Sequence, residues 1–215
     1  MFSMPKDLII DPFCGSGTTL VAAHELGRRG VGLDINPQFV DMSNRRLTQT
    51  SLLEDRERAS AYRDEGKNLL KYLEPGTAQL CITSPPYWNI HTRKRSADYK
   101  TPRPYSSLEG DIGNISDYSE FLNQLKEILG VVFKAIRVGG YCAVIVMDIR
   151  VLDKFIPFHI DVSTIMESVG FKFSDVIIWD RTKEYNNLRT LGYPYKFIVN
   201  KVHEYILVFQ KSRGE

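Results

Sequence analysis

The sequence of 215 residues has few cysteines, few histidines and no long apolar run. Its three cysteines, Cys14, Cys81 and Cys142, are odd in number and far apart, which excludes a disulfide framework and argues against a zinc site. No segment is long and apolar enough to span a bilayer, and the first residues lack a secretory pattern. We therefore expect a cytoplasmic protein with reduced thiols, no metal and no membrane partner.

The sequence also lacks an excess of charge of either sign, since its net charge is +2. A hydrophobic content of 43% and a charged content of 25% are typical of a globular protein, and the length favours one domain over 1–215. Basic residues gather in two stretches, which would suit a polyanion, although solvated loops are commonly charged. These residues are Arg93, Lys94, Arg95, Lys100 and Arg103, followed by Arg181, Lys183, Arg189, Lys196 and Lys201.

Apolar runs alternate with helical patterns along the chain. We expect strands at 7–11, 30–35, 60–65, 78–84, 140–148, 173–180 and 204–211. We expect helices at 17–26, from Asn36 onward, at 118–136 and at 160–169. The pattern predicts an α/β fold: a Rossmann-like sheet of seven strands, mostly parallel with an antiparallel last strand, and helices on both faces.

Four polar residues stand where predicted strands end. They are Asp11, Asp34, Ser84 and Asp148. Because ligands of such folds bind beyond the carboxyl ends of the strands, we expect these residues to share one crevice.

The stretch DPFCGSGTT (Asp11 to Thr19) links the first strand to a helix. Gly15 and Gly17 allow a tight turn and a close approach of a ligand to the backbone. Leu20 occupies the position of the third glycine of the dinucleotide pattern, and the lysine of a phosphate-binding loop is missing, so NAD and ATP are disfavoured. Asp34, at the end of the second strand, can accept hydrogen bonds from both hydroxyls of a ribose.

A second stretch, CITSPPYWN (Cys81 to Asn89), turns a strand into a rigid corner. Proline donates no backbone hydrogen bond and restricts the residue before it, so Pro85 and Pro86 give this corner a stiff geometry. Ser84 and Tyr87 flank the prolines with a hydroxyl and an aromatic face. Alone, such a corner most often just ends a strand.

Together the two stretches carry a family resemblance. The segment DPFCGSGTTLVAAHELGRRGVGLDINP resembles the S-adenosylmethionine motif of DNA methyltransferases that modify exocyclic amino groups. TSPPYW resembles their catalytic motif, in the Ser-Pro-Pro-Tyr form associated with N4 of cytosine. The resemblance implies a methyltransferase fold, a cofactor half at about 1–75 and a catalytic half at about 76–215. The cofactor residues that it implies are Asp11, Phe13, Gly15, Gly17, Thr18, Asp34, Ile35 and Asp64.

The same resemblance implies a chemical role for the corner. The amino group of cytosine is a poor nucleophile because its lone pair is delocalised into the ring. Ser84 Oγ and the Pro85 carbonyl, held by Pro86, would accept hydrogen bonds from this amino group and free the lone pair. Tyr87 would stack on a flipped base, and Trp88 would widen that surface. Catalysis would come from positioning and polarisation, without a catalytic histidine or cysteine.

DNA is the expected partner, as in restriction–modification systems. The loops 89–115 and 181–202 are the expected substrate loops, since lysine and arginine neutralise phosphates. They are small for a target-recognition region, so a homodimer, a separate specificity partner or a single-stranded substrate would have to compensate. The substrate residues expected are Trp88, His91, Arg93, Lys94, Arg95, Arg189 and Lys196.

Several alternatives remain open. A serine in the first motif position favours N4 of cytosine over N6 of adenine without settling the choice. An RNA methyltransferase keeps the same fold and cofactor. A regulatory subunit that binds the cofactor without catalysis is disfavoured by the intact Ser84–Tyr87 corner.

Overall fold

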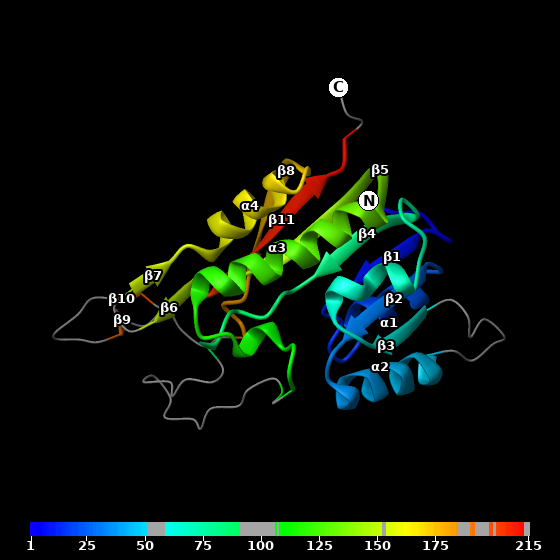
Figure 1. The fold of residues 1–215 in the computed structure, drawn as a ribbon, viewed down its shortest axis with the longest axis horizontal. Helices are drawn as coiled ribbons and strands as arrows, with labels where there is room; N and C mark the ends of the chain where they lie inside the picture. The colour runs from blue at the N-terminus through cyan, green and yellow to red at the C-terminus, as the bar shows by residue number, and fades with distance from the viewer. Residues whose placement is uncertain are drawn as a thin grey trace.

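The central sheet has seven strands in the order β3-β2-β1-β4-β5-β11-β8 (Figure 1). This computed structural model describes residues 1–50, 59–90, 106, 108–151, 154–184, 190–191, 198–199 and 201–212. In sheet order the strands are Ala59–Arg63, Arg29–Asp34, Leu8–Asp11, Ala78–Thr83, Ile136–Val146, His203–Gln210 and Lys172–Asp180. The first five pair in parallel, whereas β11 pairs antiparallel with both β5 and β8. The predicted sheet, mostly parallel with an antiparallel last strand, is confirmed.

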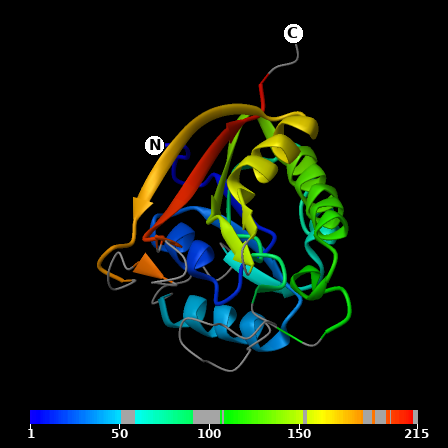
Figure 2. The same ribbon diagram turned by 90° about the vertical axis from the view of Figure 1, so that its left-hand side faces the viewer.

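Helices cover both faces of this sheet, as predicted. Helices α1 (Thr18–Glu25) and α2 (Pro37–Thr50) pack together on one face. Helices α3 (Tyr118–Ala135) and α4 (Phe158–Ser168) cover the other, together with the 3-10 helix η1 (Gly66–Lys71) (Figure 2). None of these helices, within the described ranges, is long and apolar enough to cross a membrane.

The longest helix, α3, forms where the apolar periodicity of the sequence is strongest. Asp117 caps its N-terminus, since its side chain accepts a hydrogen bond from the backbone N–H of Glu120 at 2.8 Å. One stripe of the helix is buried against the sheet. Its buried residues are Phe121, Leu125, Ile128, Leu129, Val132 and Ala135.

The structure corrects the predicted start of β5. The strand begins at Ile136, directly after α3, rather than at Gly140. Ala78 pairs with Ile136 and Leu80 with Tyr141, so the residues between them on β5 form a bulge in which Gly139 has a φ of 83°. A glycine tolerates this left-handed conformation, and it therefore lies inside the strand instead of separating helix from strand.

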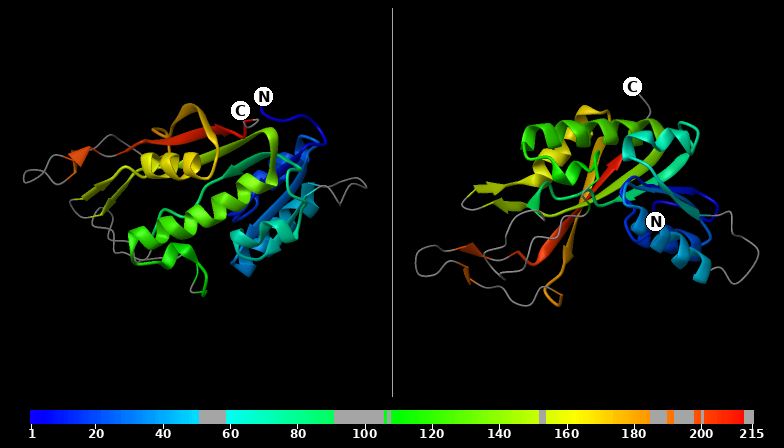
Figure 3. Two further views of the ribbon diagram at one scale, coloured as in Figure 1. Left: turned by 45° about the horizontal axis from the view of Figure 1, so that its top comes forward. Right: turned by 60° about the horizontal axis from the view of Figure 1, so that its bottom comes forward.

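Two short hairpins were not predicted. Strands β6 (Ile149–Val151) and β7 (Lys154–Ile156) pair with each other beyond the carboxyl end of β5. Strands β9 (Thr190–Leu191) and β10 (Ile198–Val199) form the second pair. Figure 3 shows both hairpins projecting from the same end of the molecule. Runs of two or three residues are too short to carry a periodic signal.

The contact between α1 and α2 depends on Gly17. This residue precedes α1 with a φ of 78°, and a Cβ atom there would lie 2.0 Å from Ser43 Oγ on α2. Glycine is therefore required both by the backbone conformation and by the close approach of the second helix.

We expect Gly17→Ala to destabilise the protein more than Gly76→Ala. Gly76 has a similar φ of 70°, but a Cβ atom there would meet nothing within 4 Å. Both variants carry the left-handed strain of about 1–2 kcal/mol, and only the first adds overpacking of about 1–3 kcal/mol. Urea unfolding measures the difference, and equal losses would contradict the packing role of Gly17.

Candidate functional site

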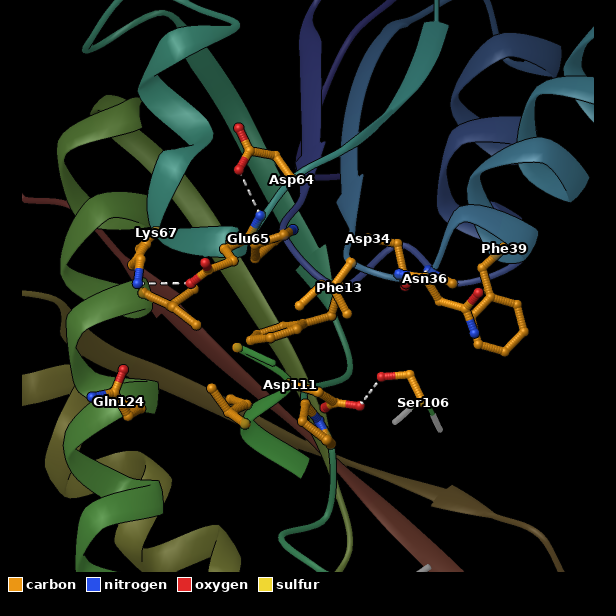
Figure 4. Close-up of a pocket in the computed structure, with 18 of the residues that line it drawn as sticks. Phe13, Asp34, Asn36, Phe39, Asp64, Glu65, Lys67, Ser106, Asp111 and Gln124 are labelled. Atoms are coloured by element: carbon orange, nitrogen blue, oxygen red, sulfur yellow. Dashed lines mark hydrogen bonds and ion pairs between the residues drawn. The ribbon is translucent and has the colours of Figure 1, made fainter. Parts of the chain in front are cut away.

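A pocket of about 280 Å³ lies at the carboxyl ends of β1, β2, β3 and β4 (Figure 4). Residues that follow all four strands line it, and the segment around Asp111 and one face of α3 complete its wall. Its volume is close to the lower end of the roughly 300–1,000 Å³ typical of ligand sites. Of the four residues predicted to share one crevice, Asp34 and Ser84 line this pocket. The prediction is wrong for the other two, since Asp11 is buried and is not among the lining residues, and Asp148 belongs to a separate cluster.

Asp34 is held by the turns that follow β1 and β2. Its Oδ2 accepts the Gly15 N–H at 2.9 Å, and its Oδ1 accepts the Asn36 N–H at 2.8 Å. Burial raises the pKa of Asp34, and the nearby charge of Asp111 adds to this effect. A carboxylate has about four lone-pair sites, so Asp34 retains acceptor capacity for ligand hydroxyls.

Phe13 and Gly15 form the part of the pocket next to Asp34. The ring of Phe13 projects into the pocket in Figure 4. Gly15 has a φ of 50°, and a Cβ atom there would meet nothing within 4 Å, so its backbone is open to a ligand. Ile35 also lines the pocket. The cofactor roles predicted for these three residues are therefore compatible with their placement.

Gly17 and Thr18 lie outside this part of the pocket, and their predicted cofactor roles stay predictions. Neither lines the pocket. Gly17 packs against α2, as described above. Thr18 is exposed, and its Oγ1 accepts a hydrogen bond from Arg46 Nη1 at 3.2 Å. The glycine pattern predicted the turn correctly, and the structure adds that the close approach of α2 requires a glycine at position 17.

Asp11 is buried, with 4% of its surface exposed. Its Oδ1 accepts the Phe13 N–H at 3.1 Å and the Thr83 hydroxyl at 2.7 Å. Burial raises the pKa of Asp11 from 3.8 to about 6, against the lowering effect of these hydrogen bonds. Asp11 therefore connects the glycine turn to Thr83, the last residue of β4 and the one before Ser84. Its predicted contact with a cofactor stays a prediction.

Asp64 lines the pocket, but the turn after β3 occupies much of its carboxylate. Oδ1 accepts from the Glu65 N–H and Asn68 Nδ2, and Oδ2 accepts from Tyr72 OH and Lys71 Nζ. Desolvation alone would raise the pKa of Asp64, but these hydrogen bonds outweigh it and lower the pKa. A contact with the adenine amine of a cofactor stays a prediction.

The Ser-Pro-Pro-Tyr corner follows β4 and opens into the same pocket. Ser84 is exposed, and both Ser84 and Pro86 line the pocket, whereas Pro85 is buried. Tyr87 is half-buried, with its ring edge-on to Phe158 at a centroid distance of 6.5 Å. The corner thus brings the Ser84 hydroxyl to the pocket, whereas the Tyr87 ring packs beside Phe158 and is not among the lining residues.

Trp88 requires a correction, because it was predicted to extend an exposed stacking surface. The structure buries it, with 8% of its surface exposed, in the main hydrophobic core. Its ring packs edge-on against Tyr118 at 5.1 Å, and its φ of 50° turns the chain inward. Burial of a large aromatic side chain outweighs the cost of this backbone conformation.

Two residues of the pocket region were missed. Asp111 lines the pocket from the predicted substrate loop 89–115, where it caps the 3-10 helix η3 (Ile112–Asn114) by accepting the Gly113 N–H at 2.9 Å. Arg46 on α2 donates from Nη1 to the Ser16 carbonyl at 2.7 Å and so holds the glycine turn. The Asp-Ile-Gly sequence at 111–113, typical of a capped turn, is the one sequence signal that could have pointed to Asp111. No sequence signal pointed to Arg46.

Six predicted substrate residues lie outside the part of the chain that the structure describes. They are His91, Arg93, Lys94, Arg95, Arg189 and Lys196. Their roles stay predictions.

Asp148 belongs to a separate polar cluster beyond the end of β5. Its Oδ1 lies 2.5 Å from His159 Nδ1, and its Oδ2 accepts from Tyr205 OH at 3.5 Å and lies 4.0 Å from Lys201 Nζ. Burial lowers the pKa of Lys201 to about 8, although Asp148 opposes the shift. The cluster ties β5, α4 and β11 together, and it lies next to the corner because Phe158 contacts Tyr87.

The pocket residues fit a nucleoside that carries positive charge. Phe13 offers a flat face for a base, Asp34 offers acceptors for ribose hydroxyls, and Gly15 leaves room beside the backbone. Acidic side chains predominate among the residues that line the pocket. Lys67 is the single basic side chain among the described lining residues, and its Nζ already pairs with Glu65 at 2.7 Å. All three cysteines are buried free thiols, and no described group of three or more potential ligands forms a metal site.

We expect Asp11→Asn to change the pH dependence of stability. The folded pKa of Asp11, about 6, exceeds its ordinary value of 3.8, so the wild type loses stability as pH rises through that window. The asparagine keeps an acceptor and does not titrate, so the variant should gain about 2–3 kcal/mol relative to wild type between pH 4 and 7. Urea unfolding at several pH values measures this, and parallel curves would contradict it.

Comparison with known proteins adds two groups of matches. Type II methyltransferase M1.MboII of Moraxella bovis is 44% identical over 50 residues, 23% of this chain and 19% of that enzyme. DNA adenine methyltransferase YhdJ of Escherichia coli is 38% identical over 69 residues, 32% of this chain and 24% of that enzyme. The matched segments thus span only about a fifth to a quarter of these relatives.

Solved structures share the fold at low sequence identity. A SAM-dependent methyltransferase of Methanosarcina mazei superposes with a TM-score of 0.59 at 12% identity, covering 98% of this chain and 95% of that one. An rRNA methylase of Streptococcus thermophilus gives 0.54 at 12% identity, covering 99% and 90%. These matches establish the fold alone.

Residues 1–45 and 78–215, which include the glycine turn, Asp34 and the Ser-Pro-Pro-Tyr corner, match the N6_N4_Mtase family, described as DNA methylase. The match covers most of the chain, and it supports S-adenosylmethionine as the cofactor. The chain belongs to this DNA methylase family.

Proposed function

We propose that this protein methylates N4 of cytosine in DNA, with S-adenosylmethionine as methyl donor. The observation that carries the proposal is that Ser84 and Pro86 of the corner line the same pocket as Phe13 and Asp34. A methyl donor bound by the glycine turn would therefore lie beside the groups that bind the target amine. When bound, S-adenosylmethionine supplies an electrophilic methyl group.

In this proposal the corner polarises the target amine. Ser84 Oγ is exposed at the pocket and accepts one amine N–H, and the Pro85 carbonyl accepts the other. Pro86 fixes the direction of that carbonyl, because proline restricts the backbone of the residue before it. Acceptors placed in advance stabilise the positive charge that develops on the amine nitrogen, without a proton-transferring side chain.

Tyr87 orients the target base in the same proposal. Its half-buried ring rests on Phe158, which limits its motion and leaves part of the ring available for stacking. A base stacked there has left the duplex, so single-stranded DNA is a competent substrate as well. We assign the folded unit over 1–215 to a single methyltransferase domain, with DNA as its partner.

Methylation of N6 of adenine is the second candidate. The similarity to an adenine methyltransferase, YhdJ, over 69 residues favours it. Cytosine and adenine both present an exocyclic amine next to a ring nitrogen, and the two acceptors of the corner would bind either one. The serine at position 84 is the feature that favours cytosine.

The decisive experiment identifies the methylated nucleoside. The protein is incubated with labelled S-adenosylmethionine and double-stranded DNA, single-stranded DNA or RNA, and the digested products are analysed by mass spectrometry. N4-methylcytosine in DNA is the expected product. N6-methyladenine would overturn the base assignment, and methylated RNA would overturn the substrate assignment.

We expect Ser84→Ala and Tyr87→Ala to lower methyl transfer by about 100-fold or more, with cofactor affinity changed by less than about threefold. Both side chains are assigned to the target base rather than to the cofactor. Ser174→Ala, on exposed β8, is the control and should retain activity. Calorimetry measures cofactor binding separately from activity. Full activity of Ser84→Ala would contradict the proposed mechanism.

A further inference from the structure

The chain returns to the pocket between β4 and α3. Gly110, with a φ of 87°, lies so close to the ends of β2 and β3 that a Cβ atom there would approach Glu65 Cδ to 3.1 Å and Ile35 Cδ1 to 3.3 Å. Asn114 Nδ2 donates to the Ser106 carbonyl at 3.0 Å, which closes the segment on itself. We call residues 108–114 the strap, and it encloses one side of the pocket.

Asp111 of the strap presents a carboxylate to this pocket. Its Oδ1 accepts the Gly113 N–H at 2.9 Å, and its Oδ2 accepts the Ser106 hydroxyl at 2.5 Å. Both donors are neutral. Within the described ranges, no basic side chain lies within ion-pair distance of Asp111, whereas Lys67 pairs with Glu65 and Lys71 with Asp64.

Asp34 is the other pocket carboxylate without a basic partner among the described residues. In the view of Figure 4, Asp34 and Asp111 lie above and below Phe13. The two charges are close enough for Asp111 to raise the pKa of Asp34. Two carboxylates that repel each other in a partly buried pocket cost free energy, and a positively charged ligand would offset that cost.

We propose that Asp111 makes the pocket selective for the charge of its ligand, so that it binds cationic S-adenosylmethionine more tightly than neutral S-adenosylhomocysteine. The proposal rests on the cofactor proposed above. The methyl donor carries a sulfonium, an ammonium and a carboxylate, for a net charge of +1, whereas the demethylated product has lost the sulfonium charge. Asp34 is assigned to the ribose that both molecules share, so Asp111 is the residue that distinguishes them.

The test compares Asp111→Asn with wild type and with Asp117→Asn. Asparagine retains the oxygen that caps η3 and removes the charge. Asp117 is also an N-cap aspartate, at α3, and it does not line the pocket. Affinities are measured by calorimetry for S-adenosylmethionine, S-adenosylhomocysteine and sinefungin, whose amine replaces the sulfonium, so no nucleic acid is needed.

We expect Asp111→Asn to lower the affinity for S-adenosylmethionine and for sinefungin by about tenfold, and the affinity for S-adenosylhomocysteine by less than about threefold. Asp117→Asn should leave all three unchanged. Equal losses for the charged and neutral ligands, or no loss, would overturn the role of Asp111 while leaving the proposed methylation intact. Failure of wild type to bind S-adenosylmethionine would overturn both.

A second measurement uses only the wild-type protein, so it does not depend on whether the variants fold. Added salt screens charges. Raising the salt concentration from 0.05 to 0.5 M, about a tenfold range, should therefore lower the affinity for S-adenosylmethionine more than the affinity for S-adenosylhomocysteine. Parallel salt dependences of the two ligands would overturn charge selectivity.

Gly110→Ala separates the shape of the strap from its charge. The added Cβ would press on Glu65 in a left-handed backbone position, so the strap must shift. We expect both ligands to lose affinity by a similar factor of about threefold or more. Gly139→Ala, with a φ of 83° and open space around its Cβ, is the matched control and should bind both ligands normally. A selective loss of the charged ligand in Gly110→Ala would contradict this division of roles.

Discussion

The hydrogen bond from the Thr83 hydroxyl to Asp11 is the contact on which the geometry of the site depends. Asp11 ends β1 and also accepts the Phe13 N–H, so one carboxylate fixes the start of the glycine turn and the last residue of β4. Ser84 follows directly. The spacing between the glycine turn and the Ser-Pro-Pro-Tyr corner is thereby set by a buried bond of 2.7 Å between neighbouring parallel strands.

The fold was largely predictable because its signals are local. The stripe on α3, the helix start at Asn36 and the apolar runs of the seven strands each follow from short-range periodicity or capping chemistry. The start of β5 was not predictable in this way. A glycine pair reads as a break between elements, whereas here Gly139 forms a bulge inside a strand, and only the pairing with β4 reveals that.

For the site, the sequence predicted the residues that follow strands but not those that reach the pocket from elsewhere. Asp34 and Ser84 line the pocket because parallel strands bring their carboxyl ends to one edge. Asp111 reaches the pocket through tertiary packing, and Arg46 reaches the glycine turn beside it in the same way. Trp88 shows the opposite error: it follows the Ser-Pro-Pro-Tyr motif, yet the structure buries it in the core. Gly17 also matches a motif position, and the approach of α2 requires a glycine there independently of any ligand.

The position of β11 has a consequence for how the protein is made. Residues 203–210 insert between β5 and β8, so β8 has no neighbour in the sheet until the ribosome has synthesised β11. Strands β1 to β4 pair with one another, so each has a neighbour in the sheet before β11 is synthesised. During translation, the part of the sheet that carries the glycine turn can therefore pair its strands while β8 still lacks its neighbour β11, so β8 stays unpaired longest.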